Sequence, residues 1–119
     1  MPDTTPGVGA QQGDEGVGVR LRRVAVRGPS MSPTLRDGDV VLVWFGARVR
    51  AGDIVLVRWS SRPEQLSVKR AARPADRGWW VLGDNDHGST DSRLLGPAEV
   101  LAVVRARLWP RPRRFRSRP

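Results

Sequence analysis

Short apolar runs separated by Gly, Pro and Asp dominate the hydrophobic pattern from residue 17 onward. These runs are rich in β-branched residues and have little of the 3.6-residue period of a helix, so the pattern predicts strands. The expected strands cover residues 19–26, 39–45, 53–59, 66–72, 78–82 and 100–108. Runs that are apolar at nearly every position are typical of strands covered on both faces. We therefore predict an all-β fold, a small folded-over or barrel-like antiparallel domain.

Two of the expected strands begin with the same short sequence. Residues 38–43 read Gly-Asp-Val-Val-Leu-Val, and residues 52–57 read Gly-Asp-Ile-Val-Leu-Val. An internal duplication would explain this echo. Two successive strands that are each entered through a Gly-Asp turn would explain it equally well, and we favour the turn chemistry.

The segment 66–82 reads as a β-hairpin with residues 74–77 as its loop. If Arg73 pairs with Gly78, the register places Lys69 opposite Leu82. The loop that begins at Gly83 would then emerge from the sheet beside the lysine.

The domain organisation follows from composition. Residues 1–16 are rich in Gly, Asp, Thr and Gln, and we expect them to be disordered. The 119-residue chain has room for one small domain, which we place at residues 17–108. The longest apolar run, residues 40–45, is too short to span a membrane, and no secretory signal is recognisable. The sequence therefore predicts a chain without a transmembrane segment and a cytoplasmic location.

The net charge of +9 is concentrated at the C-terminal end. Residues 105–119 contain seven arginines and no acidic residue, and residues 109–119 form an Arg/Pro-rich basic tail. Such a tail could contact nucleic acid, anionic lipid or an acidic protein. A solvated run of terminal charges is the commoner case. A non-catalytic basic binding module stays open as one interpretation of the chain.

Several kinds of site are excluded by composition. The chain has no cysteine, which rules out thiol catalysis, disulfides and thiolate metal sites. His87 is its one histidine, so a multi-histidine metal site is impossible. We assign no metal and no cofactor to the chain.

Lys69 stands out because the other 20 basic residues are arginines. A lysine amine in an apolar site can lose its proton near neutral pH and act as a base, whereas a guanidinium stays charged. Nucleotide bias toward arginine codons would also leave a lone lysine. Ser30 lies in a turn of Gly and Pro residues, and a serine hydroxyl becomes a good nucleophile only when a base accepts its proton.

Three motifs in order resemble type I signal peptidases and their relatives. Residues 30–34, Ser-Met-Ser-Pro-Thr, followed by a Gly-Asp-apolar strand, are similar to the nucleophile motif of that family. Residues 68–71, Val-Lys-Arg-Ala, resemble the segment that supplies the lysine base. Residues 83–93 resemble the family's Gly-Asp-Asn loop with its Ser-x-Asp-Ser-Arg end. The resemblance covers residues 24–104 and implies the β fold of signal peptidases and of the C-terminal domain of LexA-type repressors.

The resemblance implies a role for each matching residue. Ser30 is the nucleophile, with its backbone N–H as one oxyanion donor, and Lys69 is the general base. Ser89 matches the serine that holds the lysine amine in place. Gly28 stands where some family members have a serine that supplies a second oxyanion donor, so another group must replace that donor here.

The same resemblance implies two supporting charge pairs, Asp84 with Arg70 and Asp91 with Arg93, that stiffen the loop around the dyad. A Ser-His-Asp arrangement through His87 is the alternative. We instead expect His87 to be a solvent-exposed loop residue.

Within the family, the overall likeness is greatest to the small soluble enzymes that mature nickel-type superoxide dismutase. This implies a serine endopeptidase that removes an N-terminal leader from a precursor polypeptide, with a nickel superoxide dismutase precursor as the expected substrate and the nickel belonging to that substrate. A self-cleaving LexA-like module and a signal peptidase acting at a membrane surface are the enzymatic alternatives.

Overall fold

The structure, a computed structural model, describes residues 20–115. The expected disordered segment 1–16 lies outside these residues. The described chain forms, in order, β1 (Arg20–Ala25), β2 (Val40–Phe45), β3 (Ile54–Arg58), β4 (Leu66–Pro74), β5 (Trp79–Leu82), α1 (Ser92–Leu95), β6 (Glu99–Trp109) and β7 (Arg113–Arg114). Each of the six predicted strands is present, and the all-β antiparallel fold is confirmed.

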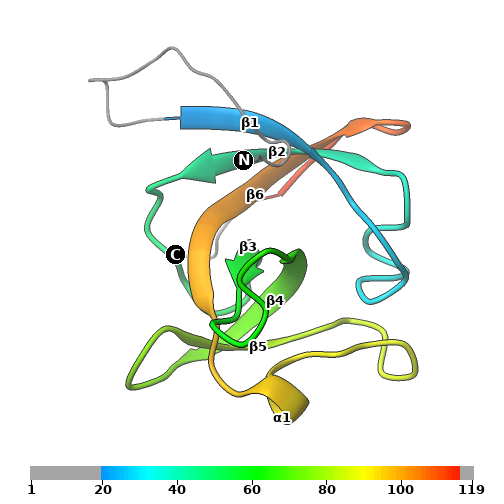
Figure 1. Cartoon of the computed structure of the whole chain (residues 1–119). Coiled ribbons are helices and arrows are strands. Elements are labelled where there is room, and N and C mark those ends of the chain that lie inside the picture. Colours follow the sequence, from blue (N-terminus) through cyan, green and yellow to red (C-terminus); the bar gives the residue numbers. More distant parts are fainter. Residues whose placement is uncertain (1–19, 116–119) are drawn as a thin grey trace.

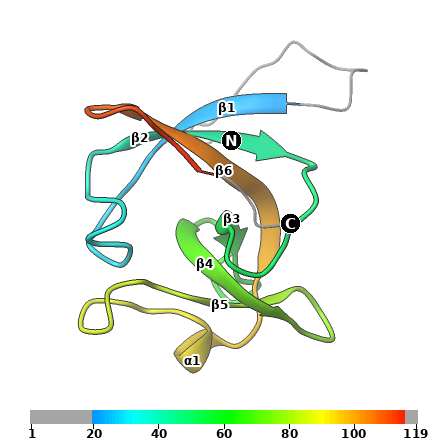
Figure 2. The ribbon, with the colours of Figure 1, turned by 180° about the vertical axis from the view of Figure 1, so that it is seen from behind.

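All strands belong to one antiparallel sheet with the order β1-β2-β6-β3-β4-β5, and β7 pairs with β6. The long strand β6 pairs with β2 along one part of its length and with β3 along another. In Figure 1 this strand bends from the half of the sheet that contains β1 and β2 to the half that contains β3, β4 and β5. The view from behind shows the same two halves facing each other (Figure 2). The sheet is therefore folded over on itself.

Strand β3 is buried on both faces. Ile54 and Leu56 belong to a core cluster between the two halves of the sheet, and Val55 and Val57 belong to a second cluster beneath the β3–β5 half. All four side chains are at most 3% exposed. Because successive side chains of a strand point to opposite faces, an uninterrupted apolar run is what such a position requires.

The two Gly-Asp turns have the same internal structure. Asp39 and Asp53 each accept a hydrogen bond from the backbone N–H three residues earlier, with both donor–acceptor distances at 2.9 Å. The preceding Gly38 and Gly52 have φ angles of 91° and 96°, which only glycine adopts without strain. Turn chemistry is therefore sufficient to explain the repeated sequence.

The predicted register of the β4–β5 hairpin is wrong by one or two residues. Leu82 pairs with Arg70 rather than with Lys69, and Arg73 pairs with Trp80 instead of Gly78. The pairing shifts between Ala71 and Arg73, and an irregularity of this kind leaves no signal in the alternation of apolar residues. Continuing the register beyond Leu82 brings Lys69 alongside Gly83, the first residue of the next loop.

The described part of the expected basic tail is built into the sheet. Strand β6 extends to Trp109, and after a short turn β7 pairs with it through Ala106↔Arg114 and Arg107↔Arg113. Phe115 then packs against the core cluster between the two halves. Backbone pairing and one aromatic side chain thus hold this segment in place despite its charge.

Candidate active site

Ser30 lies in the loop between β1 and β2, residues 26–39, which we call the serine turn. Met31 and Leu35 are both 0% exposed and anchor the turn in the core between the two halves. The Leu35 N–H donates to the Met31 carbonyl at 2.9 Å, and Gly28 has a φ of 81°. Buried apolar anchors on one side of the turn leave Ser30 half-buried beside them.

A second loop, residues 83–91 between β5 and α1, is fastened to the serine turn; we call it the acidic loop. The Asn85 N–H donates to the Ser30 carbonyl at 2.8 Å. A Cβ at Gly83 would lie 2.7 Å from the same carbonyl and would overlap the Ser89 side chain. Glycine is required at position 83 because the Ser30 carbonyl and the Ser89 side chain leave no room for a Cβ there.

Lys69 lies in the middle of β4, opposite Val55 of β3, and is only 4% exposed. Burial lowers the pKa of its amine below the ordinary lysine value, and the negative charge of Asp91 partly opposes this effect. The register places the lysine next to Gly83, which itself contacts Ser30 and Ser89. Ser30 and Ser89 thus lie close to the loop residue that the extended register places beside Lys69.

Asp91 organises the acidic loop from within. Its carboxylate is 1% exposed and accepts hydrogen bonds from the Gly83 N–H at 2.8 Å, the Ser89 hydroxyl at 3.0 Å and the Arg93 backbone and guanidinium at 2.8–3.1 Å. Burial alone would raise the pKa of this carboxyl, but the hydrogen bonds outweigh burial and hold the pKa well below its usual range. A permanent negative charge therefore lies close to Lys69. The Ser89 hydroxyl is directed to this carboxylate.

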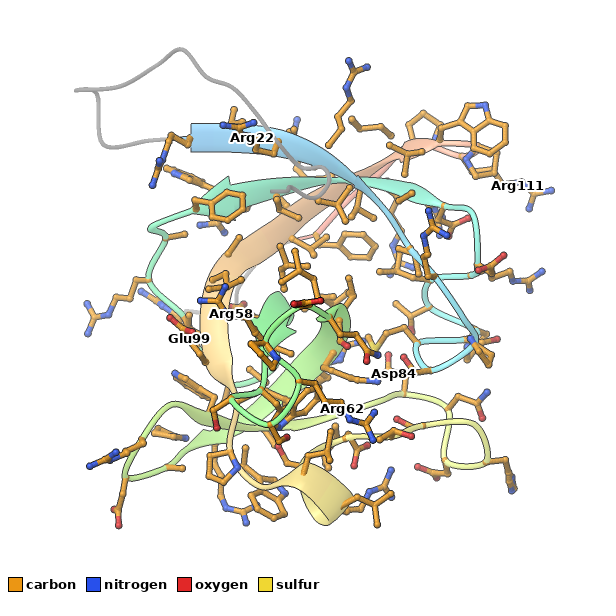
Figure 3. The ribbon with its side chains drawn as sticks, in the orientation of Figure 1. Arg22, Arg58, Arg62, Asp84, Glu99 and Arg111 are labelled. Carbon is orange, nitrogen blue, oxygen red and sulfur yellow. The ribbon has the colours of Figure 1, made fainter. Side chains whose placement is uncertain are left out.

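Asp84 connects three elements of the site. Arg70 donates two hydrogen bonds to its carboxylate, through Nε at 3.2 Å and Nη2 at 2.6 Å, and the Thr34 hydroxyl donates a third at 2.7 Å. In Figure 3 Asp84 lies where the serine turn approaches the acidic loop. Burial would raise the pKa of Asp84, but these hydrogen bonds outweigh it and lower the pKa. The bidentate geometry fixes the acidic loop to β4 as well as to the serine turn.

Arg107 of β6 is a residue of the site that the sequence did not reveal. Its Nη1 donates to the Thr34 carbonyl at 3.1 Å and lies 3.6 Å from the Asp39 carboxylate, while its Nε donates to the Arg111 carbonyl at 2.6 Å. The guanidinium thus ties the β6–β7 hairpin to the serine turn. In the sequence Arg107 is one of a run of arginines, and nothing there distinguishes it from its neighbours.

The structure also shows the surroundings of Gly28 and His87, two residues considered in the sequence analysis. The Gly28 N–H donates to the Asp37 carboxylate at 2.7 Å, so this group is already occupied. His87 is exposed, and Asp91 receives its hydrogen bonds from other residues. This arrangement does not support a Ser-His-Asp triad.

Within residues 20–115 no group of three or more acidic or histidine side chains is arranged to hold a metal ion. The same part of the chain contains no helix of the length and apolar character that crossing a bilayer requires.

Known proteins similar to this chain are subunits of one kind of protease. The mitochondrial ATP-independent inner membrane protease subunit 1a of Arabidopsis thaliana is 35% identical over 71% of this chain and 68% of its own length. Mitochondrial inner membrane protease subunit 1 of Mus musculus and that of Homo sapiens are 31% and 30% identical, each over 73% of this chain and 69% of the relative.

These relatives correct the predicted location. The expected cytoplasmic location is wrong, because the similar proteins are protease subunits of a membrane. The prediction rested on the lack of a long apolar run, and a catalytic domain can work at a bilayer surface without crossing it.

The family assignment agrees with the fold and with the motifs that the structure brings together. The Peptidase S24-like family matches residues 19–104, which include β1 to β5, both loops of the site and most of β6. The chain therefore belongs to the Peptidase S24-like family.

Proposed function

We propose that this chain is a serine endopeptidase in which Ser30 is the nucleophile and Lys69 is its general base. The observation that carries the proposal is the burial of the only lysine of the chain, at 4% exposure, on a strand beside the loop that binds the Ser30 carbonyl. Burial favours the neutral amine, which is the form that can accept a proton.

The reaction follows from these two groups. The Ser30 Oγ attacks the scissile carbonyl carbon while the Lys69 amine takes the hydroxyl proton. The resulting ammonium then gives that proton to the leaving amine as the peptide C–N bond breaks, and an ester to Ser30 remains. Water, deprotonated by the neutral Lys69, attacks the ester, and the proton returns to Ser30 Oγ as the acid product leaves. One amine thereby serves both half-reactions.

The Ser30 backbone N–H is our candidate for one oxyanion donor. Among residues 20–115 it makes no hydrogen bond, so it is available to a developing negative charge. Gly28 contributes the φ of 81° that shapes the turn, since its own N–H is engaged by Asp37. Asp91 and Asp84 act as positioning residues that hold the acidic loop against the dyad.

The substrate we propose is an extended precursor polypeptide that loses an N-terminal leader. The similar inner membrane protease subunits support a protein substrate and a site of action at a membrane surface. The nickel superoxide dismutase precursor stays a prediction that rests on the likeness of the sequence motifs.

A fluorophosphonate, which phosphonylates an activated serine hydroxyl with loss of fluoride, tests the dyad without knowledge of the substrate. We expect mass spectrometry to locate the label on Ser30 in the wild type and to find none in Lys69→Arg, since arginine keeps the charge but cannot accept a proton. Equal labelling of both proteins would contradict the dyad. Incubation with the dismutase precursor tests the substrate separately, because an active dyad that leaves the precursor intact removes only that substrate.

A further inference from the structure

A cleft of about 270 Å³ is lined by residues of β4, of β7 and of the turn that leads into β3. Arg70, Arg113 and Arg114 line it, together with Gly52, Asp53 and Phe115. Arg70 follows Lys69 in β4, so successive side chains point to opposite faces of the strand. Lys69 is not among the residues that line the cleft, and Arg70, which also binds Asp84, is the residue that the cleft shares with the surroundings of the proposed dyad.

The charge of this cleft is positive. Asp53 is the acid among its lining residues, but it is 4% exposed and its carboxylate accepts the Arg50 N–H at 2.9 Å. Asp84 pairs with Arg70, whereas Arg113 and Arg114 have no ion-pair partner among residues 20–115. The β6–β7 hairpin adds further arginines and no acid between residues 105 and 115. An anion in the cleft would therefore meet a positive potential that residues 20–115 leave uncompensated.

The backbone of Arg113 and Arg114 and the side chain of Arg113 are held in place before any ligand binds. Arg113 and Arg114 form β7 and pair with Arg107 and Ala106 of β6. The Arg113 guanidinium lies 5.0 Å from the centre of the Phe115 ring, and that phenylalanine is half-buried against the core. Fixed cations lose less conformational freedom on binding than those on a flexible tail.

The hairpin also presents apolar surface next to these charges. Trp109 is 61% exposed and Leu108 is 38% exposed at the end of β6. In Figure 3 Arg111 extends outward from this tip, away from the body of the molecule. Tryptophan beside arginine is a combination suited to the interface of an anionic bilayer.

We propose that the cleft lined by Arg70, Arg113 and Arg114 is a binding site for a phosphate group. The planar guanidinium matches the geometry of phosphate oxygens, and the charges of Arg113 and Arg114 beside the cleft suit a group with more than one anionic oxygen, while Arg70 stays paired with Asp84. The phosphate belongs either to the headgroup of an anionic phospholipid, which Trp109 would help to engage, or to a small phosphate compound.

The site is tested by titrating the full chain with inorganic phosphate and following backbone and arginine side-chain NMR signals. We expect the shifts to concentrate at Gly52, Arg113, Arg114 and Phe115. The double variant Arg113→Gln/Arg114→Gln should bind phosphate at least about tenfold more weakly, because charge-assisted hydrogen bonds are lost. Arg113→Lys/Arg114→Lys, which keeps the charge and the strand, should also bind more weakly since lysine lacks the planar fork.

The matched control is Arg62→Gln/Arg77→Gln, which removes the same charge at two exposed positions outside the cleft. An equal loss of affinity in this control, shifts scattered over the surface, or acetate binding as tightly as phosphate would overturn the proposal.

Vesicles of zwitterionic lipid, with and without an anionic phospholipid, identify the source of the phosphate. Binding to the anionic vesicles that depends on Arg113 and Arg114 supports a lipid headgroup. Binding of free phosphate without binding of vesicles supports a small phosphate compound. Binding of a single-stranded oligonucleotide but not of phosphate would overturn the proposal in favour of a nucleic-acid surface.

Discussion

The two Gly-Asp turns, one in each half of the folded sheet, are locally alike yet serve different surroundings. In each, the aspartate N–H donates to the carbonyl three residues earlier at 3.0 Å, and its carboxylate accepts the N–H of that same residue at 2.9 Å. Each glycine N–H donates at 2.8 Å to a neighbouring strand or loop, to Val26 in one case and to Ala71 in the other. Identical short sequences thus build identical turns in both places.

The difference lies in what reaches each turn from elsewhere in the chain. Asp39 faces Arg107 at 3.6 Å at the end of the serine turn. In the other half the Gly52 carbonyl accepts a hydrogen bond from Arg70 at 3.0 Å, and Arg70 in turn holds Asp84. Local sequence therefore sets the shape of each turn, whereas arginines distant in sequence connect each turn to the site.

Removing the proposed nucleophile or the proposed base should have the largest effect on peptide cleavage. We expect Ser30→Ala in one half and Lys69→Arg in the other to lower kcat/KM by roughly 10⁴-fold or more, since each dyad member is useless without its partner. The double variant should be no worse than either single variant. Peptide cleavage assays measure this, with circular dichroism to verify folding. Substantial activity in Lys69→Arg contradicts the proposed base.

The contact between the two halves is broken by Gly83→Ala. The added methyl group would meet the Ser30 carbonyl and the Ser89 side chain, and overpacking of this kind costs about 1–3 kcal/mol of unfolding free energy. We also expect cleavage to fall at least about tenfold, because a displacement of about 1 Å can cost even more.

Gly88→Ala is the control for this variant. A Cβ there would lie 3.0 Å from the Asn85 side-chain nitrogen and 3.3 Å from the Pro29 ring, a milder crowding in the same loop. If both alanine variants lose the same activity, the particular importance of Gly83 is refuted.

The likeness of the two turns is tested by Asp39→Ala and Asp53→Ala. Each removes a carboxylate that accepts a backbone N–H, so we expect both to lower the free energy of unfolding by about 1–3 kcal/mol. Only Asp39→Ala should also lower kcat, because it removes the ion pair with Arg107 and leaves the Thr34 carbonyl as the contact of this arginine with the serine turn. Denaturant melts and steady-state kinetics measure the two effects. Equal loss of kcat in both would mean that Arg107 has no special role.

The smallest effect concerns the cost of burying the lysine. Its pKa is lowered in the folded state, so the unfolded chain binds more protons between the folded pKa and the ordinary value of about 10.4. At a pH below the folded-state pKa, the buried lysine therefore lowers the free energy of unfolding of the wild type. This loss disappears as the pH rises toward about 10.4. We expect Lys69→Met to be more stable than wild type at neutral pH, with the difference shrinking at alkaline pH. A difference that does not change with pH would contradict this account.

The strands were predictable because they depend on local patterns, whereas the residues proposed for the site were indicated by a family resemblance. Apolar runs between Gly and Asp located β1 to β6, and the order of three motifs indicated Ser30, Lys69 and the acidic loop. The register of the β4–β5 hairpin was not predictable, since the irregularity after Ala71 depends on how the sheet bends.

Other features were missed for different physical reasons. Strand β7 consists of Arg113 and Arg114, which have no apolar pattern, and it forms because β6 offers free backbone groups and Phe115 anchors the chain. Helix α1 spans four residues, too few for a recognisable period, and is capped by Asp91, whose carboxylate accepts the Arg93 N–H. The role of Arg107 depends on contacts with residues about 70 positions away, at Thr34 and Asp39.

The protonation state of Lys69 is the central claim, and the chain allows it to be measured directly. Because Lys69 is the only lysine, ¹³C labelling of lysine gives a single side-chain Cε signal that needs no assignment. We predict that this signal titrates with a pKa below the ordinary lysine value of about 10.4, and that kcat/KM rises over the same pH range. Titration at the ordinary value would contradict the account.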